Sequence, residues 1–275
     1  MLVSTKSLSI FISLNTFLIC LALLQAFLIE QFIYNNVINI FNIFLIFIAR
    51  NYTLLYFVNT LSNDKPLISN DMQIVPKEDY NYEFDMNVIS STTIETLTHV
   101  IIKGYYSFDA SNMIYFDLAC FIPISFMFEL IFDLFHYIGH RTLHSAYLYK
   151  YIHKKHHKFQ HPTTIITFYQ DPIDIITTNS LPVILTLSII PRLSYFQFSL
   201  IIIYKTYGEI CGHLGKKCYP TGSFCQFIWI PKLLNIELYT EEHDLHHSLN
   251  NCNYSKRFSL WDKAFGTFKS CQQLS

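Results

Sequence analysis

The chain opens with a long apolar stretch. Residues 7–29, SLSIFISLNTFLICLALLQAFLI, carry no charge over 23 positions, and a bilayer-spanning helix needs about 20. A cleaved signal peptide could also start with Lys6 and an apolar run, but its apolar core would be only about 7–15 residues long and would end at a small-residue cleavage site. The stretch here is longer and has no clear site of that kind. We therefore predict a membrane anchor helix.

A second charge-free run follows at residues 31–49, between Glu30 and Arg50. The two runs together predict a helical hairpin with Lys6 and Arg50 on one side, which the positive-inside rule makes cytoplasmic. The second run contains four asparagines. An interfacial helix is therefore the alternative to a second span.

The remaining sequence alternates between polar and apolar segments. Residues 61–90 are polar and contain prolines and acidic residues, which is typical of a loop or linker. Apolar sequence returns at 113–135 and again at 175–204, where two prolines and an arginine interrupt the run and predict two short helices in a membrane hairpin. The pattern divides the chain into a membrane anchor (1–60), a polar linker with amphipathic segments (61–112) and a catalytic domain (113–275).

Composition agrees with an integral membrane protein built from helices. Charged residues make up 14% of the 275 positions and hydrophobic residues 51%, whereas soluble domains have about 25% charged residues. A formal net charge of −1 gives no basic surface for nucleic acid. Seven cysteines without a CxxC pair fit a reducing compartment or a membrane better than a disulfide framework.

Histidines cluster in the second half of the chain. Of the 12 histidines, 11 lie between His136 and His247. Three groups stand out: HYIGHRTLH at 136–144, HKKHH at 153–157 and HDLHH at 243–247. Spacings of three and four residues place the rings on one face of a helix, and the spacing HxxHH occurs twice.

So many imidazoles indicate metal binding. A set of eight histidines exceeds the three or four ligands of a single zinc ion, so it implies two metals. The zinc-protease signature HExxH is absent, and two irons that activate dioxygen are the best chemical interpretation. The isolated His99 is interpreted as a packing residue.

The order HxxxH, HxxHH, membrane hairpin, HxxHH resembles the sterol desaturase and fatty acid hydroxylase superfamily of membrane di-iron oxygenases, over roughly residues 116–269. The stretch HRTLHSAYLYKYIHKKHHKFQHP is similar to C4-methylsterol monooxygenases. The segments DPID (171–174) and NYSKRFSLWDKAFGTFK (253–269) are similar to C5-sterol desaturases. The chain therefore resembles a sequence between these two branches.

The resemblance implies an all-α fold in which membrane helices carry a cytoplasmic helical cap with a histidine-ligated di-iron site. The implied metal ligands are His136, His140, His153, His156, His157, His213, His243, His246 and His247. Position also favours His213, because it follows the hairpin directly and Glu209 lies one helical turn before it. The candidates for supporting roles, such as orienting a ligating imidazole through its other nitrogen, are Asp244, Glu209 and His144; Asp244 as an ordinary solvated helix residue is the alternative.

The expected activity is hydroxylation or desaturation of a lipid with dioxygen and reducing equivalents. A sterol is the expected substrate, through C4-methyl oxidation or C5 desaturation. A fatty acid or other lipid hydroxylase of the same superfamily is the first alternative, and a non-catalytic sterol- or metal-binding relative is the second. The spacing of the histidines does not decide between hydroxylation and desaturation.

The resemblance also implies cytochrome b5 and its reductase as electron donors, and the endoplasmic reticulum as location, with the histidines facing the cytoplasm. A basic rim near the clusters would either contact lipid headgroups or dock the donor; it consists of Arg141, Lys150, Lys154, Lys155 and Lys158. If the runs at 7–29, 31–49 and 113–135 all cross the membrane, the histidines lie opposite the N-terminus. One run would then be interfacial, or the N-terminus lumenal.

Overall fold

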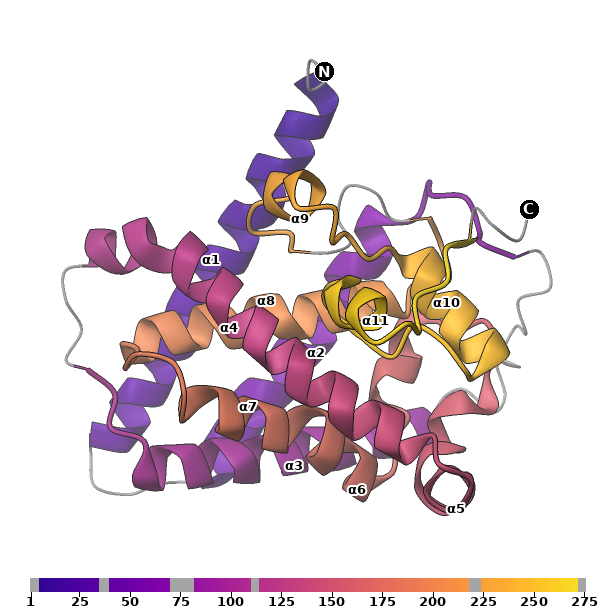
Figure 1. The fold of residues 1–275 in the computed structure, drawn as a ribbon. Helices are drawn as coiled ribbons and strands as arrows, with labels where there is room; N and C mark the ends of the chain where they lie inside the picture. The colour runs from indigo at the N-terminus through magenta and orange to yellow at the C-terminus, as the bar shows by residue number, and fades with distance from the viewer. Residues whose placement is uncertain (1–4, 35–39, 70–81, 110–113, 218–223, 272–275) are drawn as a thin grey trace.

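The structure is a computed structural model that describes residues 5–34, 40–69, 82–109, 114–217 and 224–271, and these residues are mostly helical (Figure 1). They form no β-sheet. Two isolated bridges join Leu67 to Lys216 and Asp109 to Ser194. The predicted all-α fold is confirmed.

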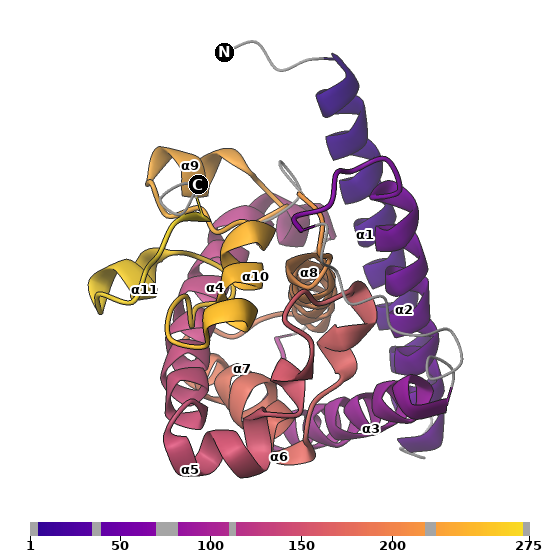
Figure 2. The same ribbon diagram turned by 90° about the vertical axis from the view of Figure 1, so that its right-hand side faces the viewer.

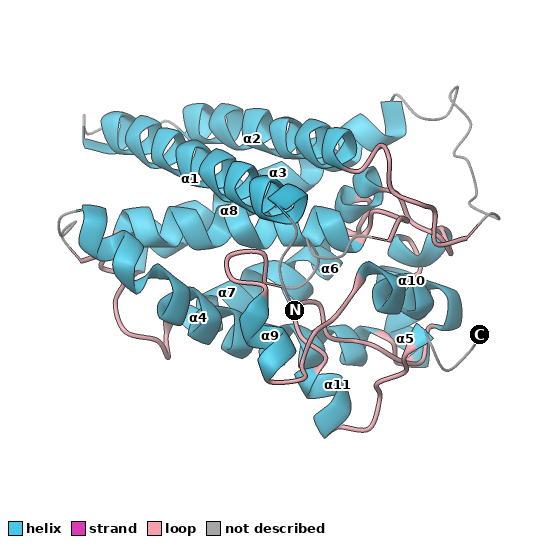
Figure 3. Ribbon diagram, turned by 90° about the horizontal axis from the view of Figure 1, so that it is seen from above, coloured by secondary structure: helices cyan, strands magenta, loops and turns pink. Residues whose placement is uncertain are grey.

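Five long helices run side by side and form the body of the molecule (Figure 3). They are α1 (Thr5–Tyr34), α2 (Ile40–Leu61), α3 (Tyr82–Tyr105), α4 (Ile114–Leu143) and α8 (Tyr195–Gly212). Three segments are long and apolar enough to cross a membrane, namely Leu8–Glu30, Ile40–Leu61 and Ile114–Leu143. The structure therefore contains three candidate spans, in agreement with the membrane protein predicted from composition.

The second span differs from the prediction, because Arg50 does not end it. Arg50 lies in the middle of α2 and is buried. Its guanidinium donates to Gln25 on α1 and forms an ion pair with Glu95 on α3. Because a charge that is paired inside a helical bundle need not reach water, it is no marker of a span end. Residues 35–39, which include three of the four asparagines, lie outside the described residues.

Helix α3 begins at Tyr82, inside the segment predicted to be a linker; residues 70–81 and 110–113 of that segment lie outside the described residues. It runs antiparallel to α2, since Asn51 donates to Thr92 and Tyr52 donates to Asp85. Counting α3, four long helices alternate in direction from the start of α1 to the end of α4. Because α3 is not among the three candidate spans, the side of the membrane on which the histidines lie stays a prediction.

The predicted hairpin at 175–204 forms, although its second helix is longer than expected. A continuous helical run consists of α6 (Pro172–Ile175), the π-helix η4 (Ile176–Ser180) and α7 (Leu181–Leu187), and α8 returns alongside it. Ser194 starts α8 with a capping box to Gln197. Because α8 continues to Gly212, it carries the chain directly to His213.

Short elements cover one end of the helices (Figure 2). They are α5 (Ala146–Leu148), the π-helix η1 (Tyr149–His153), the 3-10 helices η2 (His156–Lys158) and η3 (Thr164–Phe168), α9 (Trp229–Leu233), α10 (Thr240–Leu249) and α11 (Leu260–Ala264).

The loop between α10 and α11 is tied to α4. The carboxylate of Asp133 accepts the backbone N–H groups of Lys256, Arg257 and Phe258 at 2.8–3.0 Å. Asp133 lies one turn before His136, so this loop is held next to the histidines of α4.

Arg257 holds the same loop against α8. Its buried guanidinium pairs with Glu129 of α4, with 2.8 Å between Nη2 and Oε2. On its other side it occupies the space where a side chain at Gly208 of α8 would lie. Glycine at position 208 is therefore a packing requirement.

We predict that Gly208→Ala destabilises the protein by about 1–3 kcal/mol, the usual cost of overpacking. Gly104→Ala is the matched control, because a methyl group there meets no atom within 4 Å. Thermal unfolding in detergent should show a lower midpoint for Gly208→Ala alone. Equal midpoints for both variants would contradict the proposed packing of Arg257.

Candidate metal centre

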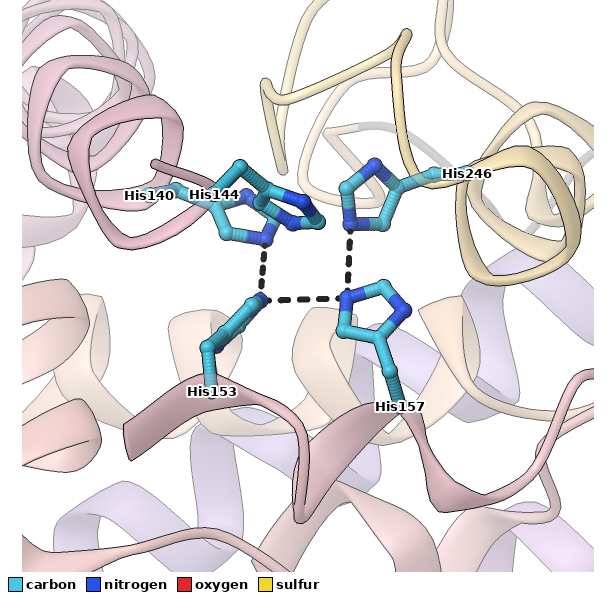
Figure 4. A group of neighbouring side chains, drawn as sticks. All are labelled: His140, His144, His153, His157 and His246. Atoms are coloured by element: carbon cyan, nitrogen blue, oxygen red, sulfur yellow. Dashed lines mark hydrogen bonds between the residues drawn. The ribbon is translucent and has the colours of Figure 1, made fainter. Parts of the chain in front are cut away.

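The structure brings nine histidine side chains into two neighbouring groups. The first histidine group consists of His140, His144, His153, His157 and His246, and the second of His156, His213, His243 and His247. Within each group, one nitrogen of every ring lies within 4.8 Å of the others. Figure 4 shows the first group, with rings from three separate segments turned toward one another.

The two HxxHH motifs contribute to the groups in opposite ways. In the first motif, His153 and His157 enter the first group and His156 enters the second. Adjacent residues on a helix point about 100° apart, so one turn can serve two neighbouring centres. The spacing therefore places each motif between the two groups.

The second motif reverses this assignment. His243 and His247 enter the second group and His246 enters the first. Each group therefore receives an i, i+4 pair from one motif and the i+3 residue of the other. Two centres close together use the full set of rings, as expected for a dinuclear site.

Hydrogen bonds to Nδ1 orient several of the rings. His140 donates to the carbonyl oxygen of Tyr254 and His246 to that of Cys252, each at 2.7 Å. His213 donates to the carbonyl oxygen of Glu209 at 2.9 Å. Because a carbonyl oxygen only accepts, these three rings carry their proton on Nδ1 and present an unprotonated Nε2 to the group.

Nε2 atoms of neighbouring rings lie close together, and in the pair of His140 and His153 both carry a lone pair. His140 Nε2 and His153 Nε2 are 3.0 Å apart, and His213 Nε2 lies 3.1 Å from His156 Nε2 and 3.0 Å from His243 Nε2. His153 is oriented through Nδ1, which donates to the carboxylate of Asp174 at 2.7 Å. Two lone pairs at this separation repel each other unless a metal ion accepts both. The donor set therefore fits bound metal.

Burial keeps His213, His246 and His144 neutral and so preserves their lone pairs. It lowers the pKa of His213 and that of His246 to about 3. Burial, followed by the neighbouring His246 and His153, lowers the pKa of His144 to about 2. Neutral imidazole is the form that binds first-row transition metals.

The segment HYIGHRTLH at 136–144 contributes different rings to the histidine groups from those predicted. His144, expected to have only a supporting role, lies in the first group, while His136 lies in neither group. His136 donates from Nδ1 to the carbonyl oxygen of Thr178 at 2.7 Å. The geometry therefore favours His140, in the last turn of α4, and His144, directly after that helix, as a ligating pair, and the role of each ring stays a prediction.

The two predicted carboxylates contact other partners. Glu209 Oε1 accepts from Lys205 Nζ at 2.6 Å, and only its backbone oxygen contacts His213. Asp244 Oδ2 accepts from His161 Nδ1 at 2.8 Å, and His161 belongs to neither group.

Sequence reasoning missed Asp174 as the carboxylate that orients a ring. Asp174 is the last residue of the DPID segment. That segment served above only to compare the chain with two branches of the superfamily. Such hydrogen bonds fix the orientation and raise the basicity of a metal-binding imidazole.

Comparison with known proteins agrees with this site. The profile of the fatty acid hydroxylase family matches residues 125–267, a range that contains every histidine of both groups. The chain belongs to the fatty acid hydroxylase family. It is an oxidoreductase family, and the family implies non-haem iron at the histidine groups.

A similar protein is the fatty acid hydroxylase vlmA of Lecanicillium sp.. It is 30% identical over 149 residues, which are 51% of this chain and 40% of the relative. The chain therefore matches less than half the length of that relative. No solved structure is significantly similar to the chain.

We predict that His144→Ala lowers the metal content of the purified protein more than His136→Ala. Only His144 presents a nitrogen to a histidine group, so its loss should release close to one ion per chain. Elemental analysis of both variants, alongside their thermal midpoints, is the measurement. A larger loss in His136→Ala would contradict the geometric assignment.

We also predict that Asp174→Asn weakens metal binding about 10–100-fold, the range found when a hydrogen-bond partner of a ligand is changed. Asp171→Asn, in the same DPID segment, is the control, because Asp171 caps α6 and asparagine caps equally well. Competition with a chelator gives both affinities. Equal affinities would remove Asp174 from the site.

Proposed function

We propose that this protein is a dioxygen-dependent hydroxylase that inserts one oxygen atom into a C–H bond of a membrane lipid, with two non-haem irons bound by the two histidine groups. The observation that carries this proposal is the gathering of nine histidine rings into two adjacent groups, in which His140, His213 and His246 present an unprotonated Nε2. Family membership supports the class of reaction.

The comparisons support the hydroxylase alternative better than the sterol reaction expected first. The matching profile and the similar protein are both named for fatty acid hydroxylation. A sterol substrate has no such support. We therefore place C4-methyl oxidation and C5 desaturation behind hydroxylation of an acyl or other lipid chain.

The balanced reaction consumes the lipid C–H bond, dioxygen, two electrons and two protons, and releases the alcohol and water. Bound iron would supply the reductive activation of dioxygen and the abstraction of hydrogen from an unactivated carbon. The protein orients the imidazoles through their Nδ1 protons. It also excludes bulk water, since His213, His246 and His247 are fully buried.

The proposed reaction needs a source of two electrons. We propose cytochrome b5 with its reductase, docking at the basic rim on the cytoplasmic face of the endoplasmic reticulum. Four of the five rim side chains are exposed, at Arg141, Lys150, Lys154 and Lys158. Lys155 instead donates to Asn87 at 2.6 Å.

We predict that the protein, purified in nanodiscs with iron and a reductant, transfers heavy oxygen from labelled dioxygen to a lipid. The double variant His156→Ala/His246→Ala removes one ring from each group and should lose most of the bound metal. It should also form at least about 90% less product, because the reaction needs the metal. His161→Ala, outside both groups, is the control. Mass spectrometry separates the outcomes: a labelled alcohol supports hydroxylation, and an unlabelled alkene indicates desaturation. Metal binding without any product would support the non-catalytic alternative.

A further inference from the structure

A short apolar segment with exposed side chains lies near the N-terminal half of α1 (Figure 1). It consists of residues 227–234, FIWIPKLL, and contains α9. Leu233 is 82% exposed, the highest value among the large apolar side chains of the described residues, and Leu234 and Phe227 are 55% and 37% exposed. Single exposed apolar side chains are ordinary, but several close together mark a surface that meets another apolar phase. These three side chains are called the α9 patch below.

The exposure of the patch is fixed by the packing on either side of it. Ile230 packs against a cluster that contains the buried rings of Phe224 and Phe258. Pro231 is buried, and its carbonyl oxygen accepts the backbone N–H of Ile236 at 2.8 Å. Because the chain is held on both sides of the two leucines, these side chains stay outside the helical body.

The segment contacts two of the candidate spans. The ring of Trp229 meets that of Phe11 on α1, with 5.4 Å between the ring centroids and 60° between the ring planes. Ile230 packs against the same cluster as Leu130 of α4. Phe11 lies three residues after the start of the candidate span Leu8–Glu30, or about 4.5 Å along the helix axis. The segment therefore lies at the level where this span begins.

The charges near the patch suit lipid headgroups. Residues 227–236 contain one lysine and no acidic residue. That lysine, Lys232, is exposed next to the two leucines, and Lys263 of α11 donates to the carbonyl oxygen of Asn235 at 2.7 Å. Tryptophan, lysine and exposed apolar side chains together are typical of segments at a membrane interface, and lysines attract anionic headgroups. A two-fold contact between copies through this patch would instead bring their Lys232 side chains together.

We propose that the α9 patch inserts into the boundary between lipid headgroups and acyl chains, on the side of the bilayer where α1 begins. Its partner is bilayer lipid. The inference concerns how the protein is seated in the membrane, so it does not depend on the proposed reaction.

This contact with lipid also bears on the position of a loop beside the histidines. The carbonyl oxygen of Ile236, two residues after the patch, accepts the backbone N–H of Ser259 at 2.9 Å. Ser259 ends the loop whose Tyr254 carbonyl oxygen orients His140. Insertion of the patch therefore sets the depth of this loop relative to the bilayer.

The test locates the patch by tryptophan fluorescence in nanodiscs. The chain has two tryptophans, and Trp229→Phe with Trp261→Phe gives a background in which Leu233→Trp is the single reporter. Lipids brominated near the headgroup should quench this reporter at least about twofold more than lipids brominated at the chain ends, because an interfacial segment lies about 5–10 Å into the boundary. Asn251→Trp, at an exposed position after α10, is the matched control and should respond only to acrylamide, a water-soluble quencher. Quenching of Leu233→Trp by acrylamide alone would place the patch in water, and protection from both quenchers would mean that protein, such as a second copy, covers it; either result overturns the proposal.

A second measurement keeps the native reporter, because an introduced tryptophan itself favours the interface. In Trp261→Phe, Trp229 is the single tryptophan of the chain. Adding Leu233→Asp and Leu234→Asp should raise acrylamide quenching of Trp229 about twofold and weaken its quenching by brominated lipid, because charged side chains withdraw from the acyl boundary into water. Leu249→Asp, at an exposed leucine that ends α10, should change neither. The same quenching with and without the two aspartates would overturn the proposal.

Discussion

The arrangement of this protein depends on the repulsion between imidazole lone pairs that are forced to face one another. Neutral histidines in water avoid such contacts. Here His140 and His153 are held at 3.0 Å because carbonyl and carboxylate groups fix the proton of each ring on Nδ1. A bound metal would convert this repulsion into coordination, which would couple folding to metal loading.

Much of the surrounding structure serves to hold those acceptors in place. The carbonyl groups of Cys252 and Tyr254 lie in a loop rather than in a regular element, and a loop alone would position them poorly. Asp133 of α4 and Asp262 of α11 bind successive backbone N–H groups of this loop, from Tyr254 to Phe258. The carbonyl groups that orient His140 and His246 are therefore fixed to α4 through Asp133 and to α11 through Asp262.

The helical body contributes more than attachment to a membrane. Arg50, Glu95 and Gln25 join three long helices through buried polar contacts, which are stable only because each charge is paired. The same helices contribute side chains to the wall of a cavity of about 90 Å³ beside α8. The candidate spans and the histidine groups are thus parts of one bundle.

The local pattern of the sequence was sufficient to predict some features of the protein. Apolar runs predicted helices that span or enter a membrane, because apolar side chains need a non-aqueous environment whatever the fold. The repeated HxxHH spacing predicted metal binding, because helical periodicity alone brings those rings together. The break between the two helices at 175–204 coincides with Pro191, whereas Pro182 lies within the first helical run.

Other features were decided only by tertiary structure. Arg50 lies inside α2 and not at its end, where it pairs with Glu95 of α3, a partner 45 residues away. The choice of His144 over His136, the division of each HxxHH motif between two groups, and the contact between Asp174 and His153 depend on how separate segments pack. His99 looked isolated because its partners lie on α2 and α8. Spacing along a helix defines which rings share a face, but the direction of that face, and what it meets, is set by contacts between residues far apart in the chain.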